Sequence, residues 1–134
     1  QIAIELALEL QSTEIVILGG TGSRLDHVLG NIQSLMLAKK QGVPCVILDE
    51  NNRIQLIDGE TVLEKDRQYG TYVSLIPLTT EVTGVDLIGF KYPLENYTFT
   101  STGSAGFGVS NEIVQKEGKI RIKAGIFVMI ESRD

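Results

Sequence analysis

The first fifty residues alternate between helical and continuous apolar patterns. The unbroken apolar run 15–18 predicts a buried strand over residues 14–19, and the apolar run 43–48 predicts a second. A three-to-four-residue spacing predicts helices over 2–10 and 25–40. The apolar positions of the helices are Ile2, Ala3, Leu6, Ala7 and Leu10 in the first, and Leu25, Val28, Leu29, Ile32, Leu35 and Met36 in the second. Apolar strands that alternate with helices are typical of a parallel sheet covered on both faces.

The pattern changes near residue 50 from a helical period to a period of 2. Residues 53–57 alternate polar and apolar, and short β-branched runs separated by glycines follow. These runs are 61–64, 71–76, 81–88, 90–92, 97–100, 109–115, 119–123 and 125–131. Many short strands predict an antiparallel sandwich or barrel, with no helix longer than about two turns beyond residue 60. Glu117 and Gly118 are predicted to form a tight hairpin turn.

The predicted fold class is therefore α/β followed by all-β. Residues 1–58 are predicted to be the C-terminal part of a Rossmann-like parallel α/β nucleotide-binding domain, and residues 59–134 an antiparallel β-sandwich. Two parallel strands are too few for a sheet of this type, and the first helix begins at Gln1 without a capping residue. We therefore expect a preceding segment to complete the α/β section.

The composition excludes several classes of partner. The chain has 134 residues, 43% of them hydrophobic, and a formal net charge of −5. Its Lys and Arg residues are scattered, so neither a nucleic acid nor an anionic membrane surface is predicted as a partner. No apolar run approaches the roughly 18–20 residues of a membrane span. The single cysteine, Cys45, lies in an apolar run and is predicted to be a buried, unreactive thiol of a cytoplasmic protein.

The glycine-rich segment 19–27 is the first candidate site, because it joins a predicted strand to a predicted helix. Its glycines allow a sharp turn and a close approach to a ligand, and a helix N-terminus favours phosphate. Arg24 adds a planar cation, and the Asp26 carboxylate can meet a ribose hydroxyl or a metal ion. His27 shares a helical face with Asn31, where it can bond to a substrate or to the β section, or act as a general base. A plain strand-to-helix turn with solvated charges is the alternative.

The loop over residues 100–112 is the second candidate site. Its hydroxyls, glycines and one amide can wrap a small polar ligand, while the alternative is a surface loop in which Ser110 and Asn111 make turn hydrogen bonds.

Two other polar segments are predicted to be structural. Residues 51–53 can reach a nucleotide but are expected to be a connecting loop, and Lys91, Tyr92 and Glu95 are expected on an edge strand.

Three segments resemble the thiamine pyrophosphokinase family, in the same order as in that family. Residues 19–31, from Gly-Gly-Thr-Gly-Ser-Arg-Leu-Asp-His to Gly30-Asn31, resemble its GGTGGRxDHxxxN segment. The other two are the central region with Ser74-Leu-Ile-Pro-Leu78, Val85 and Lys91-Tyr-Pro-Leu94, and Ser101-Thr-Gly103 through Gly108-Val-Ser-Asn-Glu112. Together they cover residues 15–112. Ser23 stands where the family usually has glycine.

The resemblance implies a thiamine diphosphokinase, which transfers a diphosphate group from ATP to the hydroxyl of thiamine. The nucleotide-binding residues that it implies are Gly20, Thr21, Gly22, Arg24, Asp26 and His27. Arg24 and Asp26 are also implied to be catalytic: Arg24 neutralises phosphate charge, and Asp26 orients the attacking hydroxyl, the metal shell or the ribose. Ser110 and Asn111 are implied to bind thiamine at a homodimer interface, where the β domain of one subunit meets the nucleotide domain of the other.

Mg²⁺ is the implied metal ion, and ATP is the co-substrate. In the family, aspartate motifs upstream of the matched segments bind Mg²⁺, and these motifs are absent from this chain. No metal ligand is therefore predicted within the chain, and the isolated chain is expected to be inactive. The alternative, from a different class, is a non-catalytic small-ligand-binding or regulatory module built on the β-sandwich. An acidic cluster upstream of this sequence in the natural protein would favour the enzyme, and the absence of such a cluster would favour the binding module.

Overall fold

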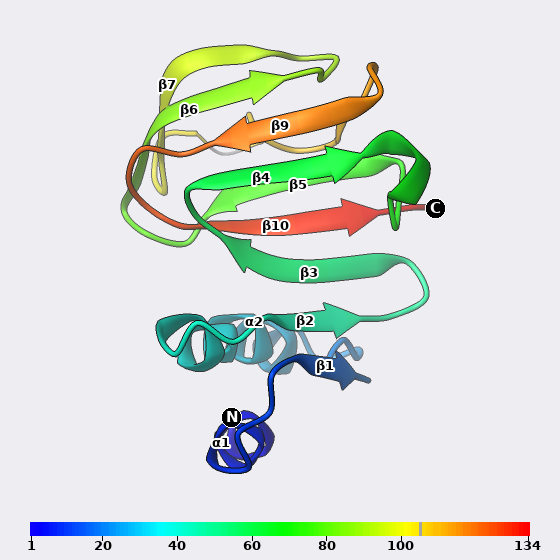
Figure 1. Ribbon diagram of the computed structural model, residues 1–134, viewed down its shortest axis with the longest axis vertical. Helices are drawn as coiled ribbons and strands as arrows, with labels where there is room; N and C mark the ends of the chain where they lie inside the picture. Colours follow the sequence, from blue (N-terminus) through cyan, green and yellow to red (C-terminus); the bar gives the residue numbers. More distant parts are fainter. Residues whose placement is uncertain (105) are drawn as a thin grey trace.

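Two β-sheets and two helices make up the fold in the computed structural model, which describes residues 1–104 and 106–134 (Figure 1). The helical part holds α1 (Ile2–Glu9), β1 (Ile15–Leu18), α2 (Leu25–Lys40), β2 (Cys45–Leu48) and β3 (Asn52–Ile57). The β-rich part holds β4 (Glu60–Glu64), the single-turn helix η1 (Lys65–Arg67), β5 (Tyr72–Pro77), β6 (Glu81–Ile88), β7 (Leu94–Thr100), β8 (Asn111–Glu112), β9 (Glu117–Arg121) and β10 (Phe127–Ser132). The switch in hydrophobic period near residue 50 therefore marks a real change of structure.

The larger sheet has six strands in the order β1-β2-β3-β10-β5-β8, and the smaller has four in the order β4-β9-β6-β7. β1 and β2 are parallel, and every other named pair is antiparallel. The predicted fold class, α/β followed by an antiparallel β-sandwich, is confirmed. Since the described parallel part is one strand pair, the Rossmann-like detail stays a prediction.

β10 serves two hydrophobic cores, because its side chains alternate between the faces of the larger sheet. Phe127 and Met129 point toward the smaller sheet and belong to the sandwich core, whereas Val128 packs in the second core with α1 and α2. In the sandwich core, the rings of Phe99 and Phe127 meet edge to face with centroids 5.0 Å apart. The larger sheet is continuous across residue 58, since β3 pairs with β10. A division of function at residue 58 stays a prediction.

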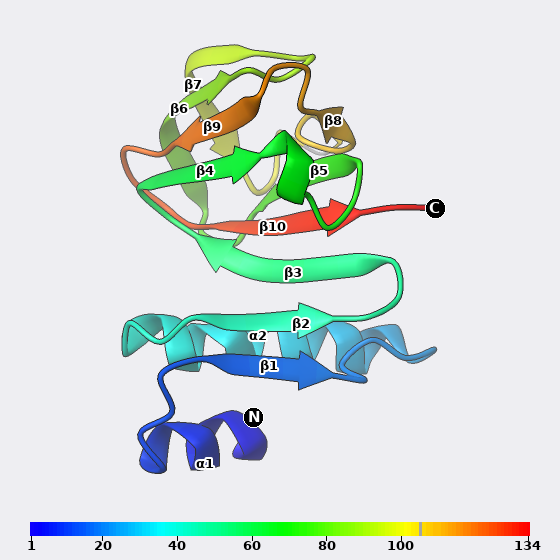
Figure 2. The same ribbon diagram turned by 45° about the vertical axis from the view of Figure 1, so that its right-hand side comes forward.

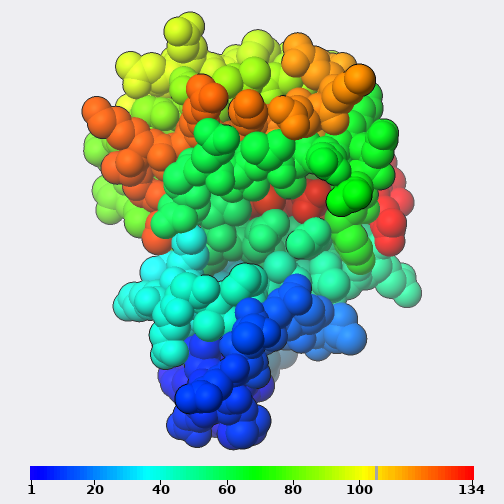
Figure 3. All heavy atoms as spheres, in the orientation of Figure 1, coloured from blue at the N-terminus to red at the C-terminus, as the bar shows by residue number. Residues whose placement is uncertain are grey.

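The face of β1 opposite the helices is open. Ile15 is buried toward the helices, while Val16 and Leu18 are exposed on the other face, so the structure does not cover this strand on both sides. Figure 3 shows the N-terminal residues as a blue lobe that extends away from the β-rich bulk. Additional apolar surface is therefore available at this edge for a further contact.

The predicted hairpin turn at Glu117 and Gly118 is wrong. Both residues lie inside β9, where Gly118 pairs with Leu63 of β4. A Cβ at Gly118 would lie 2.7 Å from the Phe90 ring, so this glycine makes room for packing rather than for a turn.

Two predicted strands are also shorter than expected. From the run 90–92 only Phe90 forms an isolated bridge, to Ile113, and from the run 109–115 only β8 is a strand. The reason is that the Asn111 side chain, rather than a backbone ladder, bonds to the main chain of Tyr92.

The remaining sequence expectations for local structure agree with the fold. Beyond residue 60, the described residues contain one helix, the three-residue η1. No described helix is both long and apolar enough to cross a membrane. Cys45 is a free, buried cysteine, and burial raises the pKa of its thiol, which disfavours the reactive thiolate.

Candidate functional site

The glycine turn connects the end of β1 to the start of α2. Gly19 has a positive φ of 71°, a conformation that favours glycine, and a Cβ at Gly20 would lie 2.9 Å from Ile47 Cγ2. Gly22 is exposed, and nothing lies within 4 Å of a Cβ built there. The first two glycines therefore shape the turn, while Gly22 leaves its backbone open to a ligand.

Two side chains from other elements hold this turn. Asn31 of α2 donates from Nδ2 to the Gly20 carbonyl at 2.9 Å, and Thr21 Oγ1 donates to the carboxylate of Asp49, which follows β2. The turn is thus fixed by side-chain contacts on both sides rather than by its own sequence alone.

Arg24 and Asp26 form an ion pair at the start of α2. Arg24 donates from Nη2 to Asp26 Oδ2 at 2.6 Å and from Nε to Oδ1 at 3.2 Å, with side chains 68% and 64% exposed. The Arg24 hydrogen bond lowers the pKa of Asp26 below its usual value. Asp26 also accepts the backbone N–H of His27, whose side chain is exposed. The predicted phosphate partner Arg24 therefore already binds an anionic group, the carboxylate of its neighbour.

The described residues do not form a magnesium site by themselves. They contain no group of three or more His, Cys, Asp or Glu side chains placed to hold a metal ion. Asp26 is the one carboxylate in the glycine turn, and Arg24 binds it. Mg²⁺ usually keeps several waters and is bound by one or two carboxylates together with substrate phosphates, so the described residues offer no complete cage of protein ligands for it.

Residues 51–53 are engaged within the chain, but only Asn51 lies in a connecting loop, because Asn52 and Arg53 begin β3. Asn52 bonds to the Asp49 carboxylate, and Asn51 Nδ2 donates to the carbonyl of Arg133 at 3.1 Å. Arg53 faces the buried carboxylate of Glu131, with 3.9 Å between Nε and Oε2.

Asn111 is buried and its amide is committed to the main chain. Its Oδ1 accepts the backbone N–H groups of Tyr92 at 3.0 Å and Glu112 at 2.9 Å, and its Nδ2 donates to the Tyr92 carbonyl at 2.9 Å. Ser110 has a positive φ of 59° and donates its backbone N–H to Ser74 Oγ at 3.0 Å, while its own side chain is exposed. Ser110 is therefore free to meet a ligand, whereas Asn111 shapes the loop.

A cavity of about 530 Å³ lies beside this loop, with mainly apolar and aromatic walls. Its walls include Tyr92, Pro93, Leu94, Phe107, Val109 and Asn111. Phe107 stacks on Tyr97 with ring centroids 4.8 Å apart, so its ring packs within the loop. Such a concave, mostly apolar site with a few polar groups suits a small organic ligand.

Sequence reasoning missed the place of Lys91 and Tyr92, which line this cavity instead of an edge strand. Tyr92 is 60% exposed, and Lys91 pairs with Glu112 at 3.3 Å, which raises the pKa of Lys91. The signal available in the sequence was Pro93, because proline ends a regular strand and leaves the preceding residues outside the ladder.

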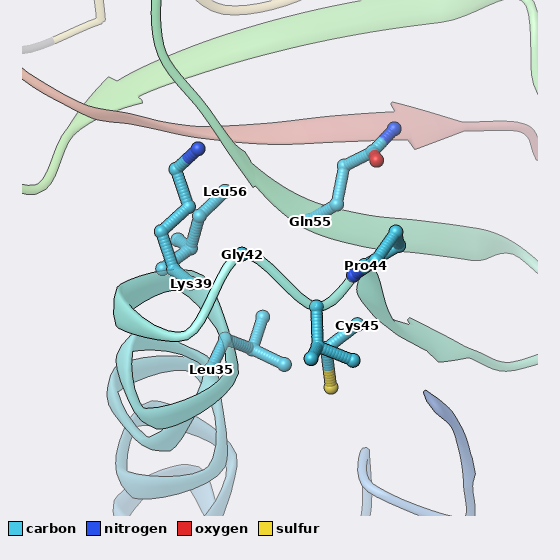
Figure 4. Close-up of a pocket in the computed structure, with 8 residues that line it drawn as sticks. Leu35, Lys39, Gly42, Pro44, Cys45, Gln55 and Leu56 are labelled. Carbon is cyan, nitrogen blue, oxygen red and sulfur yellow. The ribbon is translucent and has the colours of Figure 1, made fainter. Parts of the chain in front are cut away.

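A smaller cavity, about 240 Å³, lies where the end of α2 faces β3 (Figure 4). Its charged wall residue, Lys39, is paired with Asp58 at 2.7 Å, and its thiol, Cys45, is buried. None of the site residues predicted from the sequence lines it.

The glycine turn and Asn111 lie at the same end of the larger sheet but at opposite edges. The register runs from Leu18 of β1 through the intervening strands to Asn111 of β8. At ~4.8 Å per strand, the five steps from β1 to β8 separate the two regions by roughly 24 Å. Figure 2 shows β1 and β8 on either side of β3 and β10.

Two family models match this chain, one on each side of the residue-58 region. The model "Thiamin pyrophosphokinase, catalytic domain" matches residues 1–47, and "Thiamin pyrophosphokinase, vitamin B1 binding domain" matches residues 60–127. The chain belongs to the thiamine pyrophosphokinase family. The resemblance carried by the glycine turn and the 100–112 loop is thereby confirmed.

Relatives in the thiamine pyrophosphokinase family agree in sequence and in fold. The thiamine pyrophosphokinase of Bacillus subtilis (strain 168) is 40% identical over 134 residues, which are 99% of this chain and 61% of that protein. A crystal structure from Bacillus subtilis matches with a TM-score of 0.90 at 38% identity, covering 99% of this chain and 62% of that one. One from Geobacillus thermodenitrificans has a TM-score of 0.82 at 36% identity, covering 99% and 60%. The chain thus spans about three fifths of the length of these relatives.

Proposed function

We propose that this chain supplies the phosphate-binding turn and the thiamine-binding cavity of a thiamine diphosphokinase. The observation that carries the proposal is the match of one continuous chain to both the catalytic and the vitamin B1-binding family models. In the proposed reaction, the hydroxyl oxygen of thiamine attacks the β-phosphorus of ATP, AMP leaves, and the hydroxyl proton is lost. Such transfers depend mainly on positioning and on neutralising charge.

The glycine turn is the proposed site for the ATP phosphates. The open backbone at Gly22 and the N-terminus of α2 offer N–H donors and a positive dipole end. Phosphate oxygens replace the Asp26 carboxylate as the partner of the Arg24 guanidinium, since both groups can accept two hydrogen bonds from its planar fork. The released Asp26 carboxylate is then free to orient the thiamine hydroxyl.

The cavity beside residues 106–111 is the proposed site for thiamine. Thiamine carries a positive charge on one ring, and an aromatic face such as that of Tyr92 attracts a cation. Ser110 is not itself a wall residue, but it is exposed and lies between the wall residues Val109 and Asn111, so its hydroxyl is the proposed polar contact. The Asn111 amide fixes this loop to Tyr92.

A homodimer is proposed because the two regions are far apart within one chain. A separation of roughly 24 Å between the glycine turn and β8 favours a catalytic site in which the turn of one subunit works with the cavity of its partner. Mg²⁺ is the proposed metal ion, with most of its ligands outside the described residues. A cytoplasmic location is proposed from the single, buried, unpaired cysteine.

Two assays separate the proposed enzyme from a binding module. In the first, the natural protein is incubated with Mg-ATP and thiamine, and the formation of thiamine diphosphate and AMP in equal amounts is expected. In the second, residues 1–134 are expressed alone and are expected to form no product. Thiamine binding by the natural protein without any turnover would instead favour the non-catalytic alternative, and robust turnover by residues 1–134 would contradict the expected inactivity.

A further inference from the structure

Asp49 stands out among the carboxylates of the chain because nearly all of its hydrogen-bonding capacity is used. Its Oδ1 accepts the backbone N–H groups of Asn51 at 2.8 Å and Asn52 at 2.6 Å, and the Asn52 side chain at 3.1 Å. These bonds come from its own loop and fix the carboxylate in place. The other oxygen, Oδ2, accepts the hydroxyl of Thr21, which is 28 residues away in the chain.

The parallel pairing of β1 and β2 explains why these residues meet. Leu18 and Leu48 are partners at the ends of the two strands, and in a parallel pair both chains continue from the same edge of the sheet. Asp49 follows Leu48 directly, and the glycine turn follows Leu18. The contact is therefore a product of strand register, and it links the candidate phosphate-binding turn to the next loop of the sheet.

The Asp49 carboxylate is ionised near neutral pH, which suits it to hold the glycine turn through Thr21. Burial acts to raise the pKa of Asp49, but hydrogen bonds from Thr21, Asn51 and Asn52 together outweigh it and lower the pKa below its usual value. An ionised carboxylate accepts a stronger hydrogen bond from a hydroxyl than a neutral acceptor does. The Asp49 carbonyl also accepts the hydroxyl of Tyr69, which ties the same loop to the segment before β5.

We infer that Asp49 is a positioning residue of the ATP site: by holding Thr21, it fixes the glycine turn in the conformation that presents its backbone to phosphate. Asn31 holds the turn from the α2 side through the Gly20 carbonyl, so Thr21 and Asn31 restrain it from two directions. Both oxygens of the Asp49 carboxylate already accept hydrogen bonds from within the chain. That the turn binds phosphate rests on the proposed function. That Asp49 anchors the turn does not depend on that function.

The kinetic test uses conservative variants of the natural protein. Thr21→Val removes the hydroxyl at nearly constant volume, Asp49→Asn removes the charge at constant size, and Thr21→Ser keeps the hydroxyl. We expect Thr21→Val and Asp49→Asn each to raise the KM for ATP about tenfold, since a hydrogen bond to a charged group is lost. The KM for thiamine stays within about twofold, and the double variant is no worse than either single variant. Thr21→Ser, which restores the hydroxyl, is expected to bring the KM for ATP below that of Thr21→Val and toward the wild-type value.

A control variant and a second readout separate positioning from a general loss of structure. Thr79→Val removes a hydroxyl that donates to the Glu81 carbonyl, far from the turn, and is expected to leave the KM for ATP unchanged. Backbone NMR relaxation in the absence of substrate is expected to show the order parameters of residues 20–22 falling from about 0.85 toward 0.6 in Thr21→Val.

The outcomes distinguish this inference from the proposed function. Absence of ATP-dependent turnover in the wild type would overturn the proposed function, and the order parameters would then decide on the anchoring alone. Unchanged order parameters in Thr21→Val would overturn the inference whatever the activity. In an active enzyme, an unchanged KM for ATP in both Thr21→Val and Asp49→Asn would overturn it as well.

Discussion

The two candidate regions differ in how the fold supports them. The cavity beside the 106–111 loop is built over a closed core, in which Phe99 and Phe127 are completely buried between two sheets. The glycine turn follows a strand with one open face, where Leu18 is 75% exposed, and adjoins helices with exposed apolar side chains such as Ile2, at 81%. The proposed thiamine-binding region thus lies on a closed core, whereas the proposed phosphate-binding region adjoins an apolar face available for a further contact. Substitutions in the turn are therefore expected to change rate, and substitutions in the sandwich to change stability.

The largest expected effect is on the turn. Arg24→Ala in the natural protein is expected to lower kcat by about 10²–10³-fold, because a positioned charge partner of the transferring group is lost. The matched control is Arg121→Ala, which removes another exposed arginine paired with a carboxylate, Glu60, on the smaller sheet. Steady-state kinetics with ATP and thiamine measure both. Equal kinetics for the two folded variants would exclude a phosphate role for Arg24.

The next effect concerns the closed core. Phe99→Ala in the 134-residue chain is expected to lower the free energy of unfolding by about 3–5 kcal/mol, because it leaves a large cavity in the sandwich. Leu18→Ser is expected to change it by no more than about 0.5 kcal/mol, since that side chain is exposed. Urea titrations followed by circular dichroism give both values. If Leu18→Ser were as destabilising as Phe99→Ala, the contrast between the two regions would be wrong.

A smaller effect separates the two residues of the thiamine loop. Asn111→Ala is expected to destabilise the protein by about 1–3 kcal/mol, because buried main-chain groups of Tyr92 and Glu112 lose their partner. Ser110→Ala is expected to stay within about 0.5 kcal/mol but to raise the KM for thiamine. Denaturation midpoints and thiamine titrations would reveal the opposite pattern if Asn111 were the ligand-binding residue and Ser110 the structural one.

The smallest effect is a pH dependence from Glu131, which is 2% exposed. Burial raises the pKa of this carboxyl above its ordinary value of 4.5, so above that pH the unfolded chain loses its proton more readily than the folded one. This group therefore costs stability as pH rises through the window above 4.5, and the loss is complete once pH exceeds the folded pKa. Glu131→Gln is expected to gain stability relative to the wild type between about pH 4 and about pH 8. Urea titrations at several pH values in this range measure the difference in free energy of unfolding between Glu131→Gln and the wild type. A difference that does not change with pH would contradict a raised pKa of the buried Glu131 carboxyl.

Local patterns predicted the elements of this fold well. The structure contains the strands predicted at 14–19 and 43–48 and the helix predicted at 25–40, with nearly the predicted bounds. Each of these elements depends on residues that are neighbours in sequence. Gly118 was misassigned for the opposite reason. Position 118 needs glycine because the Phe90 ring, which is far from it in sequence, leaves no room for a Cβ atom. In a sequence, a glycine needed for packing cannot be told from a glycine needed for a turn.

The candidate sites show the same limit of local information. The residues of the glycine turn could be named from the strand–glycine–helix order, but the bond from Thr21 to Asp49 depends on the register of β1 and β2. Likewise, Asn111 was predicted to bind a ligand, and it lines the cavity, but the bond from its amide to Tyr92, 19 residues away, could not be read from the sequence. Polar residue types mark a region as functional, whereas the roles within it depend on partners that only the fold brings together.

The central claim is that the turn of one subunit works with the cavity of the other, and subunit complementation tests it most directly. Arg24→Ala and the double variant Tyr92→Ala/Ser110→Ala, each expected to be nearly inactive alone, are co-expressed and their mixed dimers assayed for thiamine diphosphate formation. Random pairing makes half of the dimers mixed, and each mixed dimer has one intact site of two, so about one quarter of wild-type activity is expected to return. Activity no higher than the sum of the two separate variants would contradict the claim, because it would place both regions of each working site in one chain.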